Sequence, residues 1–274
     1  MTTNNDTDLD WQRYGKEDPY YAVLSADRYR REYLNEQTLE EFFTSGRENI
    51  DYILNVIRTQ VDPSYRPVRA LDFGCGVGRL VTALAANAAS VVGVDVSPDM
   101  LQEAKRNCAA RGLQNVEFVL GDEELSRVEG QFDLITSYIV FQHIPVARGE
   151  ILFRNLIGHL QEGGVAAVHF TYYTPSAADA EATGNAVARP SGRQLASIPR
   201  KIAGKLRSYA RGRAAGRTGD GIASWAIQMN SYDLNRLLLI LQETGCHNCS
   251  LRFTRHASHH GVIFFFQKKR VPEI

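Results

Sequence analysis

The sequence predicts an α/β protein with a doubly wound, mostly parallel seven-stranded sheet whose last strand is antiparallel. Between residues 68 and 174, apolar runs of strand length alternate with amphipathic stretches of helical length, which is typical of parallel strands joined by crossover helices. Near the C-terminus, two strand-like runs are separated by a connection too short for such a crossover, so we expect them to be antiparallel. A helical N-terminal cap and a helical insertion after the fifth strand complete the predicted architecture.

Each predicted element follows from a local pattern. Strand-like runs occupy 69–73, 91–95, 116–120, 132–138, 165–171, 249–254 and 261–267. Helical spacing of apolar residues covers about 78–87, 98–111, 147–161 and 232–244. Ser97 and Pro98 are the expected N-cap and first residue of the helix at 98–111. The pair Gly163-Gly164 is expected to end the helix at 147–161.

The N-terminal segment predicts helices outside the sheet. Residues 1–10 are polar and are expected to lack regular structure, whereas residues 11–24 are rich in aromatic side chains. Two helices are expected to follow, the second opened by a capping box of Ser45 with Glu48 and ended at Asp62-Pro63.

Composition and punctuation divide the chain into four segments of one integrated domain. They are a helical cap at 1–67, the core at 68–174, a basic insertion or lid at 175–224, and the C-terminal part of the core at 225–274. From Arg189 to Arg217 the chain carries nine Lys or Arg residues and no acid, and apolar residues over 195–211 recur at helical spacing. Such a helix suits a lid that attracts an anionic acceptor, a peripheral contact with an anionic membrane surface, or a solvated insertion.

The overall composition restricts the class of protein. The formal net charge of zero argues against a partner bound mainly through its phosphates, so nucleic acid is not expected. No apolar run approaches the length of a membrane span, and the polar N-terminus lacks the core of a secretory signal. Four cysteines and no such signal favour a cytoplasmic protein.

The turn after the first strand carries the strongest signal. Leu71-Asp72-Phe73-Gly74-Cys75-Gly76-Val77-Gly78 joins a strand to a helix, and Asp95 ends the next strand. This pairing resembles motif I and the following strand of the class I S-adenosylmethionine (SAM) dependent methyltransferases. The resemblance covers about 68–174 and 225–268, and it implies that fold, that cofactor and methyl transfer. Arg79 stands where a dinucleotide fingerprint has its third glycine, which disfavours an NAD-dependent oxidoreductase.

The resemblance assigns a set of side chains to the cofactor. They are Asp72, Phe73, Gly74, Cys75, Gly76, Gly78, Asp95, Val96, Ser97, Met100, Asp122, Glu123, Ser137 and Tyr138. Asp95 is expected to hold the ribose hydroxyls, because a carboxylate accepts from two donors at once. Asp72 is expected near the cationic end of the cofactor, or else capping its own turn. Met100 and Asp122 are expected at the adenine, with a helix residue covering the sheet and a solvated turn as the respective alternatives.

Catalysis and acceptor binding leave weaker signals. His143 is the best candidate for a general base, since an imidazole titrates near neutrality, and its alternative is a structural histidine. Aromatic residues expected to line the acceptor site are Tyr14, Tyr20, Tyr172 and Tyr173, with packing as the alternative for each. No metal is expected. The spacing Cys246-x-x-Cys249 with His256, His259 and His260 permits a zinc site, but both cysteines suit burial as apolar residues.

These observations predict a SAM-dependent methyltransferase acting on a small-molecule or glycan acceptor, saccharide or lipid-linked, at oxygen. Oxygen is favoured because the strand at 132–138 is not followed by the Asn/Asp-Pro-Pro-aromatic signature with which many amine methylases hold a planar nitrogen. The alternatives are a methyltransferase for RNA or another nucleic acid, and a SAM-binding protein without catalytic activity.

Overall fold

The computed structural model describes residues 6–175, 227–256 and 259–269. The described residues up to Thr174 and from Gln228 onward belong to one compact unit. The predicted insertion at 175–224, including its basic helix at 195–211, lies outside the described residues apart from Pro175. The sheet and the helices that cover it belong to this compact unit.

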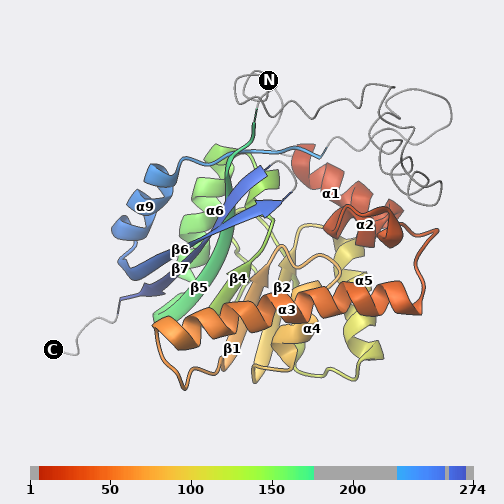
Figure 1. Ribbon diagram of the computed structural model, residues 1–274, viewed down its shortest axis with the longest axis horizontal. Helices are drawn as coiled ribbons and strands as arrows, with labels where there is room; N and C mark the ends of the chain where they lie inside the picture. Colours follow the sequence, from red (N-terminus) through yellow and green to blue (C-terminus); the bar gives the residue numbers. More distant parts are fainter. Residues whose placement is uncertain (1–5, 176–226, 257–258, 270–274) are drawn as a thin grey trace, which may run out of the picture. The chain divides into compact units, whose positions relative to one another are not determined.

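The predicted fold class is confirmed. The seven strands are β1 (Arg69–Phe73), β2 (Ser90–Asp95), β3 (Val116–Leu120), β4 (Phe132–Ser137), β5 (Leu160–Tyr173), β6 (Cys246–His256) and β7 (His259–Lys268). They are ordered β3-β2-β1-β4-β5-β7-β6 across one sheet. Strands β1 to β5 pair in parallel, whereas β7 lies antiparallel between β5 and β6 (Figure 1).

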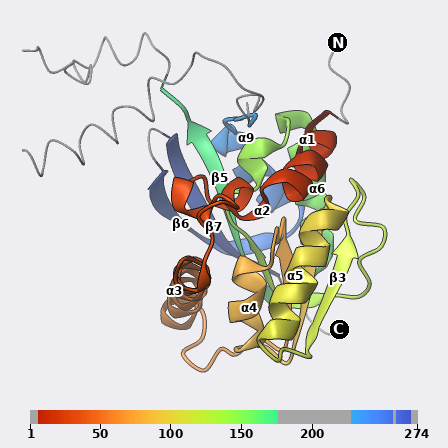
Figure 2. The same ribbon diagram turned by 90° about the vertical axis from the view of Figure 1, so that its right-hand side faces the viewer.

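Helices cover both faces of the sheet. One face carries α3 (Glu36–Gln60), α4 (Arg79–Ala85) and α5 (Pro98–Ala110), and the other carries α6 (Val146–Gly158) and α9 (Leu234–Glu243) (Figures 1 and 2). Each face has its own buried apolar cluster, because alternate residues of a strand point to opposite sides. We call these the α3 face and the α6 face.

The N-terminal helices pack against the core at the carboxyl ends of the strands. Helix α1 (Asp6–Glu17) is followed by α2 (Pro19–Val23) and a 3₁₀ turn, Asp27–Tyr29. The approach of α1 to α5 is close, since a Cβ on Gly15 would lie 2.3 Å from the Ser97 hydroxyl. The expectation that residues 1–10 lack regular structure is therefore wrong from Asp6 onward, because α1 gains its stability from this packing.

The capping box expected at Ser45 is also wrong. Helix α3 begins at Glu36, where Asn35 accepts a hydrogen bond from the Thr38 amide and Thr38 accepts one from the Asn35 amide. Ser45 lies inside the helix, and its hydroxyl donates to the Phe42 carbonyl, a local bond that a mid-helix serine readily forms.

Two strand boundaries differ from the sequence prediction. The helix expected to reach residue 161 ends at Gly158, and β5 starts at Leu160. Gly163, expected to stop a helix, has φ of 76° inside β5, where the pairing with β4 is irregular. The histidines expected in a turn lie in strands: His256 ends β6 and pairs with His259 of β7.

None of the helices in the described ranges is both long enough and apolar enough to cross a membrane.

Candidate functional site

A cavity opens at the carboxyl ends of β1, β2 and β4, beneath α1. Its empty space, including the open mouth, is about 840 Å³, which is within the usual range of small-molecule sites. Its lining consists of Thr7, Asp8, Trp11, Ala22, Val23, Phe73, Gly74, Gly76, Val94, Asp95, Val96, Met100, Gly121, Asp122, Tyr138, Ile139, Val140, His143, Ile144, Arg148 and Leu152. Parallel sheets bind ligands at this edge.

The glycine turn brings bare backbone to the cavity wall. The amides of Gly74 and Cys75 both donate to the Val94 carbonyl, which fixes the turn against β2. Gly74 and Gly76 have φ of 72° and 53°, a region that favours glycine. A Cβ on Gly74 would lie 2.4 Å from Val140, and one on Gly76 would lie 2.6 Å from Val23. Any larger residue would fill the cavity from below.

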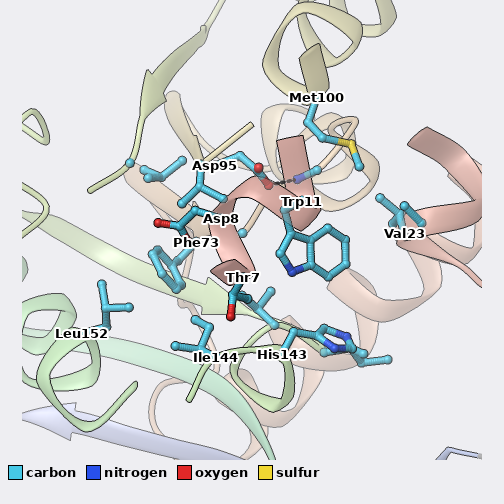
Figure 3. A pocket seen from close by; sticks show the side chains of 18 of the residues that line it. Thr7, Asp8, Trp11, Val23, Phe73, Asp95, Met100, His143, Ile144 and Leu152 are labelled. Atoms are coloured by element: carbon cyan, nitrogen blue, oxygen red, sulfur yellow. Dashed lines mark hydrogen bonds between the residues drawn. The ribbon is translucent and has the colours of Figure 1, made fainter. Parts of the chain in front are cut away.

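Asp95 presents a carboxylate that its own backbone has positioned. Oδ2 accepts from the Gly76 amide at 2.8 Å, and Oδ1 accepts from the Ser97 amide at 2.9 Å (Figure 3). Each oxygen keeps a further lone pair for a ligand. Burial raises the pKa of this carboxyl to about 6, although the amide hydrogen bonds oppose that shift.

Asp72 lies behind the cavity wall rather than in it. Its side chain is 2 % exposed and Oδ1 accepts from the Thr136 hydroxyl at 2.8 Å. Burial raises its pKa to about 7. Asp72 is therefore not placed to contact a ligand directly. Its charge would act on the site through the cavity wall.

The far end of the cavity is lined by Val96, Met100 and Asp122. Both carboxylate oxygens of Asp122 already accept from Ser126, one from its amide at 2.8 Å and one from its hydroxyl at 2.6 Å. These bonds lower the pKa of Asp122 and hold it ionised. Asp122 thus caps a turn and still borders the cavity, so its two expected roles are compatible.

Besides Asp72, five residues expected at the cofactor do not line the cavity. Cys75 is buried against Gly93, and Gly78 packs on Ala104. Ser97 caps α5 by accepting from the Met100 amide at 3.3 Å, and Ser137 is fully buried. Glu123 lies 3.3 Å from Nε of Arg148 as an ion pair. These side chains shape the wall from behind.

The four tyrosines expected at the acceptor also lie outside the lining. Tyr14 is buried against Trp11, and the Tyr20 hydroxyl lies 2.7 Å from Glu103 and 2.9 Å from Asn107 on α5. Tyr172 and Tyr173 lie at the end of β5, with their rings 6.4 and 5.6 Å from His260. All four are engaged in packing, which was the alternative for each.

His143 does line the cavity, in a 3₁₀ turn after β4. Nδ1 lies 2.9 Å from the Gln228 carbonyl, which can only accept, so Nδ1 carries the proton and Nε2 keeps the lone pair. The Gln142 amide nitrogen lies 3.2 Å from Nε2. Burial lowers the pKa of His143 to about 4, so the imidazole is neutral at neutral pH.

The cysteines and histidines near the C-terminus do not converge. In the part of the chain that the structure describes, no three His, Cys, Asp or Glu side chains are placed to hold a metal ion. Cys246 lies at one end of β6 and His256 at the other, so the strand itself separates the two halves of the proposed zinc set.

Several lining residues were missed. Helix α1 places Thr7, Asp8 and Trp11 over the cavity, and Figure 3 shows the Trp11 indole between Met100 and His143. Asp8 accepts both hydrogen bonds of an Arg148 fork at 2.6 and 2.7 Å, which ties α1 to α6. The aromatic content of residues 11–24 indicated a covering segment, but only the observed helix shows that Trp11 rather than Tyr14 faces the ligand.

One lining residue has an unusual backbone. Ile139 lies two residues beyond the end of β4 and has φ of 60°, a conformation that strains a β-branched residue. Such strain is retained mainly where the surrounding structure demands it, and it often marks functional sites. Here it turns the chain away from the strand and brings Tyr138 and Val140 to the cavity.

The chain resembles known methyltransferases. Residues 70–164 match a family model described as a methyltransferase domain. A ubiquinone biosynthesis O-methyltransferase of Methylococcus capsulatus is 36% identical over 78 residues, which are 28% of this chain and 33% of that protein. A 23S rRNA uracil methyltransferase of Shewanella is 46% identical over 54 residues, 20% of this chain and 12% of that protein. These matches thus cover a third or less of the curated relatives.

Solved structures agree with the fold. Magnesium protoporphyrin IX methyltransferase from Synechocystis, with bound S-adenosylhomocysteine (SAH), has a TM-score of 0.59 to this chain at 17% identity, covering 96% of this chain and 100% of that one. The matched domain, the sheet order and the glycine turn with Asp95 agree with one another. Residues 70–164 therefore match a methyltransferase domain, and the described residues share the fold of a solved methyltransferase that binds SAH.

Proposed function

We propose that the protein transfers the methyl group of SAM to a hydroxyl oxygen of a small-molecule or glycan acceptor. The observation that carries the proposal is Asp95, a half-buried carboxylate held by two backbone amides at the wall of a cavity that two glycines keep open. Its remaining lone pairs suit the two hydroxyls of a ribose.

The residues present fit the cofactor. Asp95 would hold the ribose, and the backbone at Gly74 and Gly76 would approach the methionine portion. Val96 and Met100 supply an apolar surface for the adenine, which a thioether suits because it packs well on aromatic rings. Asp72, ionised in part, would favour the positive charge of the sulfonium from behind the wall.

The remaining lining positions the acceptor. SAM supplies an already activated methyl group, so alignment and proton removal are what the protein must add. Tyr138, Ile139 and His143 border the cavity just beyond β4. Figure 3 shows His143 on the side away from Met100. Trp11 closes it from above, so an acceptor there would be shielded from water.

His143 is the group proposed to take the proton of the acceptor hydroxyl. Its Nδ1–H is fixed on the Gln228 carbonyl, so Nε2 carries the lone pair in the required neutral form. That lone pair accepts from the Gln142 side-chain amide, and the acceptor hydroxyl would have to displace this donor. The lowered pKa weakens it as a base but keeps it unprotonated throughout the neutral range. Because its pKa of about 4 lies well below this range, His143 stays unprotonated between pH 6 and 8. We therefore expect that its protonation does not reduce turnover anywhere between these pH values.

The chemical class of the acceptor is supported by the names of two relatives and by the character of the cavity. The ubiquinone-pathway relative bears the name of an O-methyltransferase, which supports oxygen. The rRNA methyltransferase relative supports RNA as a second candidate. The observation that favours a small molecule is the cavity itself, which is apolar, covered by α1 and of small-molecule size.

Calorimetric titration tests cofactor and site together. Wild type is expected to bind SAH and not NAD. Asp95→Asn should weaken SAH binding by about 10- to 100-fold, since hydrogen bonds to a charged group contribute about 1.5–3 kcal/mol. Asp99→Asn, at the start of α5 but outside the lining, is the matched control. Wild-type binding of NAD, or equal SAH binding by the Asp95 variant, would contradict the proposal.

The acceptor proposal needs a turnover assay. Transfer of labelled methyl from SAM to a panel of phenols, sugars and RNA identifies the acceptor class, and salt-sensitive labelling of RNA would favour the second candidate. On any hydroxyl substrate so found, His143→Asn should keep SAH affinity and lower kcat by about 10²- to 10⁴-fold. An unchanged kcat removes His143 as the base.

A further inference from the structure

Buried and half-buried polar groups gather on the α3 face of the sheet, beside the cavity but outside its lining apart from Tyr138. This polar cluster consists of Arg79, Tyr138, His169, Thr254 and His256. Arg79 begins α4, and the others lie at or just beyond the carboxyl ends of β4, β5 and β6. The proposed function uses none of them except Tyr138.

Arg79 is a buried cation with few partners. The residue is 6 % exposed, and among the described residues its guanidinium makes one hydrogen bond, from Nη1 to the Ser45 hydroxyl at 3.1 Å. A guanidinium has five N–H donors. No carboxylate of the described residues lies within ion-pair distance of it. Buried charges are normally paired, because desolvation is costly.

The nearest acid compensates Arg79 only in part. Asp72 is the carboxyl whose charge most affects Arg79, and the two lie beyond ion-pair distance. Burial raises the pKa of Asp72 to about 7, so that this carboxyl carries only part of a negative charge near neutrality. A partial positive charge therefore remains at the Arg79 end of the polar cluster.

The groups in the polar cluster beside Arg79 are uncharged side chains that can each donate or accept a hydrogen bond. Its guanidinium carbon lies 6.0 Å from the centre of the Tyr138 ring. The Tyr138 hydroxyl lies 3.4 Å from Nε2 of His256, and the His256 and His169 rings are 5.3 Å apart. His169 is fully buried, with Nε2 bonded to Thr254 at 2.9 Å and Nδ1 without a hydrogen-bond partner among the described residues.

We propose that the polar cluster is an oxyanion subsite that holds a carboxylate or phosphate group of the acceptor. Arg79 would supply the charge, and the Tyr138–His256 pair would supply one additional donor, because one member of the pair donates to the other. A guanidinium fork matches the two oxygens of such a group. The inference deepens the proposed function and rests on it for the identity of the acceptor.

The position of Tyr138 connects the polar cluster with methyl transfer. Tyr138 is the member of the polar cluster that also lines the cavity. An acceptor anchored by its anionic group at Arg79 would extend past Tyr138 toward His143.

Binding of matched probes to the SAH-saturated protein tests the subsite. The probes are benzoate, phenyl phosphate and the neutral control benzamide, titrated by calorimetry or ligand-observed NMR. Wild type should bind one or both anions at least about 10-fold more tightly than benzamide, the usual effect of a charge-assisted hydrogen bond. Arg79→Met should remove that preference and leave SAH affinity unchanged. Arg252→Met on β6 is the matched control and should retain it.

The variants separate the possible failures. Equal wild-type binding of benzoate, phenyl phosphate and benzamide overturns the subsite, whatever SAH does. A loss of SAH binding in Arg79→Met with the anion preference intact also overturns it, because Arg79 would then serve the carboxylate of the cofactor. Where Arg79→Met does not fold, Tyr138→Phe and His256→Gln decide: an undiminished anion preference in both contradicts the proposal. Failure of wild type to bind SAH counts against the proposed function alone, since the probes can be titrated without it.

Discussion

The two faces of the sheet differ most at the edge where the cavity opens. On the α6 face, Phe73, Phe141 and Phe170 are buried together, with the rings of Phe141 and Phe170 4.6 Å apart. On the α3 face, the same strands end in the polar cluster. Neighbouring residues of one strand supply both, as His169 and Phe170 of β5 show. Alternation along a strand thus lets one edge combine a rigid support with a recognition surface.

The division has an energetic basis. Burial of aromatic rings stabilises the fold through apolar area and edge-to-face contacts. Burial of polar groups contributes little unless every donor and acceptor is paired, and in the polar cluster Arg79 and His169 are not fully paired by the described residues. We therefore expect substitutions among the buried aromatic residues of the α6 face to lower stability, and those in the polar cluster of the α3 face to affect mainly binding and pH dependence.

The largest effect is expected from Phe170→Ala. Its ring contacts Phe141, Phe153, Tyr232 and Phe264, and none of these can move far in a closed core. The free energy of unfolding should fall by about 3–5 kcal/mol, as for other buried phenylalanines, in urea denaturation. Phe253→Ala, at a side chain that is 71% exposed, should change it by less than about 0.5 kcal/mol. A loss for Phe170→Ala as small as this control would erase the difference between the faces.

A smaller effect is expected from Thr254→Val in the polar cluster. The change keeps the shape but removes the hydroxyl bonded to Nε2 of His169, so both ring nitrogens would lack a protein partner. The free energy of unfolding should fall by about 1–3 kcal/mol, the cost of a buried unsatisfied group. Thr59→Val on the exposed side of α3 is the control. A loss equal to that of Phe170→Ala would show that the α3 face also carries a large share of the stability.

The sequence predicted the sheet and the glycine turn that form the base of the site better than it predicted helix α1, which covers the cavity. Alternating strands and helices identified the sheet, and the glycine spacing located the turn that carries Asp95. These features are local, since the geometry of a turn requires particular residues at particular positions. Trp11 and Asp8 were missed because their roles depend on how α1 packs against α5 and α6, over contacts such as Asp8 with Arg148 that no local pattern encodes. Arg79 was noted only as a departure from a glycine motif.

The polar cluster was hidden for a different reason. Tyr138, His169 and His256 come from three strands, and their proximity follows from the placement of β7 between β5 and β6. Gly261 of β7 makes the room, because a Cβ there would lie 2.3 Å from Nε2 of His169. A sequence gives no measure of such a distance, so the histidines invited a zinc interpretation instead.

The smallest expected effect is a change in how the free energy of unfolding depends on pH. It tests the charge state of Asp72, on which the comparison of the two faces depends. Asp72 has a pKa of about 7 in the folded protein, above the usual value, so folding takes up a proton between about pH 4 and pH 7. Asp72 therefore makes the free energy of unfolding fall as pH rises through that window. His143 and His169, with pKa values lowered to about 4 and 3, act oppositely: their stabilisation is present above pH 6.5 and is lost as pH falls toward 4.

Replacing Asp72 by Asn should isolate its share. The amide can still accept from Thr136, and the titration is removed. Relative to wild type, Asp72→Asn should gain stability between pH 5 and pH 7, by at most about 1.4 kcal/mol per pH unit, the limit for one proton. Urea denaturation at several pH values measures it. Asp122→Asn should show no such trend there, because the pKa of Asp122 is lowered and its window lies below pH 4. A flat difference for Asp72→Asn would mean that Asp72 is fully ionised beside Arg79. The charge of Arg79 would then already be balanced by Asp72. The polar cluster on the α3 face would need no anionic ligand to compensate it.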